Sequence, residues 1–167
     1  AFCRMASTLL VGDGDGAAPA FMGPLATEAA RRAALEFQAG AVSRGATILL
    51  RAAELDRPGW FMTPGVLKWP RLTLEQDGEV FAPIVQLAVA KDDEDALEQA
   101  NASRFGLAAS VFTASRARWE ALCPRIEAGC VNWNVGTAGA SSALPFGGLG
   151  LSGNHRPAAA FSVDSCA

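Results

Sequence analysis

Apolar residues recur at helical spacing in three stretches of the chain. The first stretch covers residues 27–44, where a threonine begins an alanine-rich run and a glycine follows its last residue. The second covers residues 93–103, and the third covers residues 115–128. We expect Pro124 to kink the third helix, because proline removes one backbone hydrogen bond and crowds the preceding turn.

Short, almost continuous apolar runs lie between these helical stretches. Runs of this kind are typical of strands that are buried on both faces, and helices between them favour parallel pairing. The sequence therefore predicts an α/β fold with a mostly parallel sheet flanked by helices. The predicted strands or extended segments are residues 47–50, 61–68, 83–90, 107–113 and 130–134.

The character of the chain changes after Asn134, where glycines become frequent and charged residues become rare. Apolar residues 144–146 within this region favour an ordered loop. In parallel sheets, ligands bind beyond the carboxyl ends of the strands, where this loop begins. The loop is therefore the first candidate for a functional site.

Composition excludes several classes of protein. Half of the 167 residues are hydrophobic and 19 % are charged, which predicts a folded core. With a net charge of −3 and only two lysines, Lys68 and Lys91, the chain is not expected to bind nucleic acid. No apolar stretch is long enough to span a membrane.

The cysteines and the single histidine do not form a metal-binding motif. Cys3, Cys123, Cys130 and Cys166 are far apart in the sequence, and His155 is the only histidine. Their spacing favours buried thiols of a cytoplasmic protein over a disulfide framework. The glycine-rich residues 12–16 lack the ligand pattern of a calcium loop and are interpreted as a turn.

Residues 79–83 (EVFAP) place an acidic and an aromatic side chain just before a predicted buried strand. Extended backbone puts Glu79 and Phe81 on the same side. A carboxylate accepts hydrogen bonds from both hydroxyls of a ribose, and an aromatic ring packs against a sugar or a nicotinamide. By itself this pair also fits a solvated glutamate beside a core phenylalanine.

Several motifs together resemble the C-terminal half of NAD(P)-dependent aldehyde dehydrogenases. The segment EVFAP resembles a family motif, except that this chain has Ala82 where the motif has a glycine. Other segments resemble the branch that oxidises succinylglutamate semialdehyde in arginine catabolism. The family motifs are residues 79–83, 101–109, 131–134, 145–148 and 152–153, and the branch motifs are residues 21–25, 139–142 and 152–157.

The resemblance implies roles for individual residues. Glu79 would bind the ribose on the nicotinamide side of NAD or NADP, and Phe81 would lie against the same part of the cofactor. The loop from residue 137 to residue 142 would close the aldehyde tunnel and present backbone N–H groups to a substrate carboxylate. The substrate-binding residues implied in this way are Thr137, Gly139, Ala140, Ser141 and Phe146.

The family mechanism uses a cysteine that forms a thiohemiacetal and then a thioester, but the resemblance assigns this chain no catalytic residue. Cys3 falls on a helix that follows the family's catalytic segment, so we expect it to be structural. Residues 1–167 would be the C-terminal part of the catalytic domain, without the N-terminal NAD-binding portion. That missing half, or further copies of the chain, would be its partners. The alternative is a catalytically inert fragment or a structural subunit.

Overall fold

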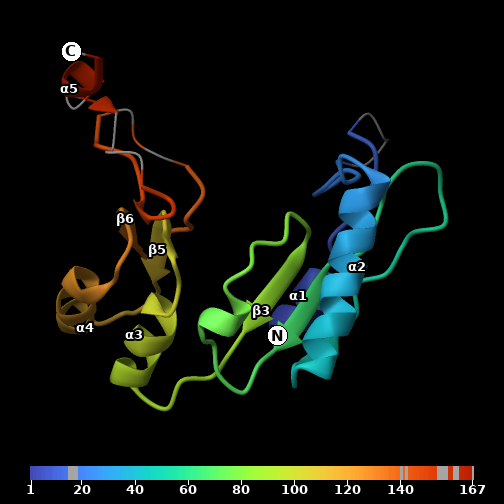
Figure 1. The fold of residues 1–167 in the computed structure, drawn as a ribbon, viewed down its shortest axis with the longest axis horizontal. Helices are drawn as coiled ribbons and strands as arrows, with labels where there is room; N and C mark the ends of the chain where they lie inside the picture. Colours follow the sequence, from blue (N-terminus) through green and yellow to red (C-terminus); the bar gives the residue numbers. More distant parts are fainter. Residues whose placement is uncertain (15–18, 140, 142, 154–157, 160–161, 167) are drawn as a thin grey trace. The chain divides into compact units, whose positions relative to one another are not determined.

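The computed structural model describes residues 1–14, 19–139, 141, 143–153, 158–159 and 162–166 (Figure 1). Backbone contacts divide the chain into two compact units. Unit 1 comprises Ala1–Arg71 and Gly78–Val89, and unit 2 comprises Leu72–Asp77 and Ala90–Ala167. Each unit combines helices and strands, which confirms the predicted α/β class.

The elements of unit 1 are α1 (Phe2–Ser7), α2 (Glu28–Ser43), β1 (Thr47–Leu50), β2 (Gly65–Lys68) and β3 (Ile84–Leu87). The three strands form one sheet in the order β1-β2-β3. β2 and β3 are parallel, as expected, whereas β1 and β2 are antiparallel. The antiparallel pair was not predicted. No helix separates β1 from β2, so the chain returns directly beside the strand that it has just left.

Helix α2 has the boundaries that its sequence predicts. The hydroxyl oxygen of Thr27 accepts a hydrogen bond from the N–H of Ala30 at 3.1 Å, and Gly45 follows the helix with a φ of +100°. Ala34 of this helix is fully buried and packs with Ala52 and Met62. Figure 1 shows α2 beside the strands of the sheet within unit 1.

Unit 2 contains α3 (Asp93–Asn101), β4 (Phe105–Gly106), β5 (Ala108–Val111), α4 (Arg116–Leu122), β6 (Cys130–Trp133), β7 (Leu149–Gly150) and α5 (Ser162–Cys166). Two short 3₁₀ helices, η1 (Leu74–Gln76) and η2 (Cys123–Arg125), also belong to it. β5 and β6 are parallel neighbours, as predicted, with α4 between them in the sequence. β4 and β7 are antiparallel, which was not predicted.

Helix α4 is shorter than predicted. It ends at Leu122 and passes into the 3₁₀ turn η2, which contains Pro124. The proline therefore ends the helix instead of kinking it, because its ring has no N–H and clashes with the carbonyl four residues earlier. The rings of Trp119 on α4 and Trp133 on β6 stack with centroids 5.9 Å apart, which ties the helix to the strand.

The four cysteines are free thiols, but the prediction that they are buried is wrong in part. Cys3, Cys123 and Cys130 are half-buried, and Cys166 is exposed. Among the residues that the structure describes, no cluster of side chains is suited to hold a metal ion. Within the same residues, every helix is too short or too polar to cross a membrane.

Candidate functional site

A pocket of about 400 Å³ lies within unit 2, between the strands β5 and β6 and the loop that follows β6. Four of the five substrate-binding residues predicted from the sequence line this pocket, and the fifth, Ala140, lies outside the described residues. The lining residues are Ala108, Gly129, Cys130, Val131, Asn132, Thr137, Gly139, Ser141, Leu144, Pro145 and Phe146.

The strands form one wall of the pocket and the loop forms the other. Cys130 and Asn132 belong to β6, whereas Thr137, Gly139 and Ser141 come from the loop. The turn from strand to loop is made at Asn134, which has a φ of +56°. Asparagine is one of the few residues with a side chain that adopts this left-handed conformation readily.

The far end of the loop packs directly on the backbone at Gly129, the residue that precedes β6. A Cβ atom at this position would lie 1.7 Å from the carbonyl oxygen of Gly147, so only glycine fits. Gly147 and Gly148 are themselves buried. This close approach of two backbones holds residues 144–146 over the strands and closes one side of the pocket.

Neutral groups make up the polar part of the pocket. None of the described residues that line it carries a charge, and the polar side chains are those of Cys130, Asn132, Thr137 and Ser141. Such a lining binds an anionic ligand group only through hydroxyl, amide and backbone N–H donors, without an ion pair. It can therefore hold a small, partly apolar ligand with one polar end.

Cys130 and Asn132 were not predicted as site residues. The predicted substrate site comprised residues of the loop alone, although Cys130 and Asn132 belong to β6 and Asn132 precedes the loop by a few residues. The signal that could have found them is their position in the strand that leads directly into the glycine-rich loop.

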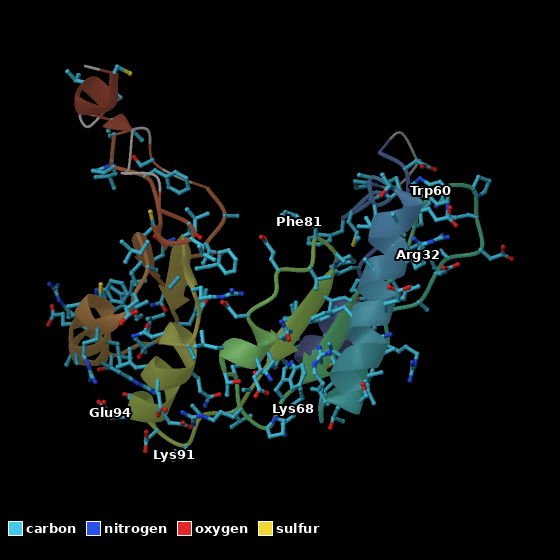
Figure 2. The ribbon with its side chains drawn as sticks, viewed as in Figure 1. Arg32, Trp60, Lys68, Phe81, Lys91 and Glu94 are labelled. Carbon is cyan, nitrogen blue, oxygen red and sulfur yellow. The ribbon has the colours of Figure 1, made fainter. Side chains whose placement is uncertain are left out.

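Glu79 and Phe81 lie on the exposed side of the segment that leads into β3 in unit 1. The side chains between and beyond them, Val80, Ala82 and Ile84, pack against the buried cluster of the same unit. Phe81 is 80 % exposed, and Figure 2 shows it at the tip of this segment. Glu79 is exposed and has no hydrogen bond or ion pair with any described residue.

The two side chains therefore lie on the same side, as the alternation predicted, and both are exposed, so the alternative of a core phenylalanine at Phe81 is wrong. An unpaired carboxylate and an exposed aromatic ring are the groups that a ribose and an attached planar ring require. The surroundings of Glu79 and Phe81 are thus compatible with the sugar end of a nucleotide cofactor.

The other two sequence candidates belong to the scaffold of unit 1. Cys3 lies half-buried on α1. Asp13, in the glycine-rich segment interpreted as a turn, forms an ion pair with Arg57, whose guanidinium lies 4.2 Å from the centroid of the Phe61 ring. Residues 15 and 16 of that segment lie outside the described residues.

Comparison with known proteins identifies one family. The model of the aldehyde dehydrogenase family matches residues 1–166. The N-succinylglutamate 5-semialdehyde dehydrogenase of Caulobacter sp. (strain K31) is 39 % identical over 167 residues, which are 100 % of this chain and 34 % of the relative. The chain thus spans about a third of the length of this curated relative.

Solved structures agree with this comparison. A betaine aldehyde dehydrogenase double mutant from Staphylococcus aureus, in complex with NAD+, is similar with a TM-score of 0.87 and 24 % identity, covering 98 % of this chain and 34 % of that one. Aldehyde dehydrogenase 21 from Physcomitrella patens, in complex with its reaction product succinate, has a TM-score of 0.79 and 26 % identity. That likeness covers 92 % of this chain and 31 % of the other.

Proposed function

The chain belongs to the aldehyde dehydrogenase family, and from this premise we propose that it takes part in the NAD(P)+-dependent oxidation of an aldehyde or semialdehyde to the carboxylate. Its own contribution is a substrate pocket in unit 2 and a cofactor-binding surface in unit 1. The observation that carries the proposal is that Thr137, Gly139, Ser141 and Phe146 line one pocket.

The proposed substrate is an aldehyde that carries a carboxylate at its far end. The pocket combines apolar walls with neutral hydrogen-bond donors, which suits an alkyl chain that ends in an anion. Two relatives support this substrate class. One is named for N-succinylglutamate 5-semialdehyde, and the other was solved with succinate as its reaction product.

The proposed cofactor contacts are those of Glu79 and Phe81. The Glu79 carboxylate would accept hydrogen bonds from the ribose hydroxyls, and the exposed Phe81 ring would cover the adjoining part of NAD or NADP. When bound, the nicotinamide cofactor supplies the hydride acceptor of the reaction. This chain's side chains would hold and orient it.

The chain would act as the C-terminal part of a catalytic domain. In this proposal the nucleophilic cysteine, which forms the thiohemiacetal and the thioester, belongs to a portion of the enzyme outside residues 1–167. Cys3 keeps a structural role on α1. The pocket residues would hold the aldehyde chain and exclude water, and the enzyme would work in the cytoplasm, where its thiols stay reduced.

A titration of the isotope-labelled chain with succinate, followed by NMR, tests the proposal. Succinate should shift the amide signals of Thr137, Gly139 and Ser141 in a saturable manner, and the neutral analogue succinamide should shift them much less. Equal shifts with both compounds, or shifts scattered over unit 1 and unit 2 alike, would contradict a carboxylate-binding pocket. Addition of NAD+ and succinic semialdehyde should give no NADH from the chain alone.

A further inference from the structure

The substrate loop is held at its beginning by two side chains from the strands of unit 2. The amide nitrogen Nδ2 of Asn132 donates a hydrogen bond to the carbonyl oxygen of Gly136 at 3.1 Å. The hydroxyl of Ser110 donates one to the carbonyl oxygen of Val135. Ser110 and Asn132 are partners in the register of β5 and β6, so they act on neighbouring peptide groups from adjacent strands.

Asn134 continues the pairing of the two strands beyond their ends. Its side-chain oxygen accepts a hydrogen bond from the N–H of Thr113 at 2.8 Å, and its side-chain nitrogen donates one to the carbonyl oxygen of Thr113 at 2.9 Å. The side chain thus imitates a strand backbone while the main chain turns away with positive φ. The first residue of the loop is thereby fixed relative to β5.

These contacts also orient the next backbone N–H groups. In a trans peptide the C=O and the following N–H point in opposite directions. Since the carbonyl groups of Val135 and Gly136 face Ser110 and Asn132, the N–H groups of Gly136 and Thr137 face away from those two side chains. Neither N–H has an acceptor among the described residues, so both are free to bind solvent or a ligand.

We propose that Ser110 and Asn132 are positioning residues, which set the conformation of the substrate loop and thereby the affinity for a carboxylated substrate. This inference rests on the proposed function and deepens it. A loop that is ordered before binding loses less conformational entropy when the ligand arrives, so affinity rises without a new contact to the ligand. We name Ser110 and Asn132 the loop anchor.

Ser110 gives the cleaner test of the loop anchor, because it is not among the residues that line the substrate pocket. Ser110→Ala removes the hydroxyl, and we expect succinate to bind about fivefold to tenfold more weakly, the effect of one lost hydrogen bond. Ser110→Thr keeps the hydroxyl. Its additional methyl group has room in a second cavity of about 290 Å³ that Ser110 lines, so binding should stay within about twofold of the wild type.

Asn132→Ala should weaken succinate binding at least as much as Ser110→Ala. Asn101→Ala is the matched control in the same unit. The Asn101 side chain also binds backbone groups, donating to the carbonyl of Arg125 at 2.9 Å and accepting from the N–H of Glu127 at 3.0 Å, but it does not contact the loop. A general loss of stability would weaken binding in both asparagine variants alike. Loop positioning predicts an effect in Asn132→Ala only.

Relaxation of the backbone amides separates failure of this inference from failure of the proposed function. The amides of Thr137, Gly139 and Ser141 should become more mobile in Ser110→Ala and Asn132→Ala, with or without succinate. If the wild-type chain binds no succinate but this mobility increases, the proposed function fails and the positioning role holds. Unchanged loop mobility, or equal succinate affinity in wild type, Ser110→Ala and Asn132→Ala, would overturn the inference.

Discussion

The two units of the chain are stabilised in different ways. Unit 1 contains the largest fully buried side chains, which are Trp69, Phe61, Met62, Leu67 and Val66. In unit 2, the buried apolar side chains among the described residues are Leu97 and Leu122, and all residues of β5 and β6 are half-buried. The unit that carries the proposed substrate pocket therefore has the smaller apolar core among the described residues.

Unit 2 also contains polar contacts between segments that are far apart in the sequence. Asp77 accepts hydrogen bonds from Ser103 and Arg104. Asn101 bridges two backbone groups near η2, and Arg118 pairs with Asp93. Polar contacts of this kind contribute less to the stability of the folded state than the burial of a large apolar side chain. They do fix the orientation of the groups that they join. The pocket therefore lies in a unit with a small apolar core, where directional polar contacts hold its elements.

The largest effect should come from the core of unit 1. Met62→Ala removes a fully buried side chain and should lower the free energy of unfolding by about 2–5 kcal/mol. Met5→Ala, at a position that is 68 % exposed, should change it by less than about 0.5 kcal/mol. Urea unfolding followed by circular dichroism measures both. Similar losses in the two variants would show that unit 1 has no specific core.

A smaller effect should come from side-chain amides that bind backbone. Gln38, which is 4 % exposed, accepts from the N–H of Ala52 at 2.8 Å and donates to its carbonyl at 3.0 Å. Gln38→Ala leaves both groups buried without partners, and should lower the free energy of unfolding by about 1–3 kcal/mol.

Asn134 makes the same pair of contacts to Thr113 at an exposed position of unit 2. Asn134→Gly retains the positive φ, and water can replace the side-chain amide. The free energy of unfolding should therefore fall by less than about 1 kcal/mol. Urea unfolding of the two variants compares them directly. A larger loss of unfolding free energy in Asn134→Gly than in Gln38→Ala would contradict the prediction that the buried amide of unit 1 contributes more to stability.

Low pH should reduce the stability of unit 2, because Asp77 becomes protonated. The hydroxyl of Ser103, followed by the backbone N–H of Arg104, holds the pKa of Asp77 below its ordinary value of 3.8. Because the pKa is lower in the folded state, the stabilisation is present above the ordinary value and is lost as the pH falls through the folded-state pKa.

Asp77→Asn should therefore reduce the fall in stability of unit 2 below about pH 4. Hydrogen exchange of the β5 and β6 amides as a function of pH is the measurement, and the β1 and β2 amides of unit 1 serve as the internal control. The prediction fails if Asp77→Asn leaves the acid response of β5 and β6 unchanged.

The smallest effect should come from the surface ion pairs of unit 2. Arg118 and Asp93 have side chains that are 55 % and 39 % exposed, so solvent and salt screen their attraction. Arg118→Ala should lower the melting temperature slightly at low salt and not at high salt. A loss that persists at high salt would mean that the Arg118 side chain contributes through packing.

Local signals predicted the elements well. The Thr27 cap and the glycine after residue 44 place α2 within one residue of its observed ends, and the strand before the glycine-rich loop is β6. The antiparallel pair β1–β2 was missed, because no periodicity in the strands indicates how the residues between them turn back. Similarly, the alternation predicted that Glu79 and Phe81 lie on the same side, but it indicated neither the exposure of Phe81 nor the ligand.

The candidate site was predicted within the loop and missed in the strands that adjoin it. The glycine-rich run identified the loop as a candidate site, and the resemblance to aldehyde dehydrogenases implied Thr137 and Gly139 within it. The hydrogen bond from Ser110 to Val135 joins residues 25 positions apart, and the contact of Asp77 with Arg104 spans 27. Side-chain contacts over such separations depend on strand pairing, for which a single sequence contains no direct signal.

The central claim is that the loop of unit 2 binds the carboxylate end of a substrate. Gly139 and Gly45 form a matched pair for this test, with φ values of +95° and +100° and open space around the position of a Cβ atom. Gly139→Ala strains the loop, whereas Gly45→Ala strains the end of α2 in unit 1 by a similar amount.

The decisive measurement is the dissociation constant of succinate for the wild-type chain and for these two variants, determined by NMR titration. We predict that Gly139→Ala weakens binding about tenfold, the equivalent of about 1.4 kcal/mol, while Gly45→Ala leaves it unchanged. Equal dissociation constants in all three proteins would contradict the claim that this loop forms the substrate-binding site.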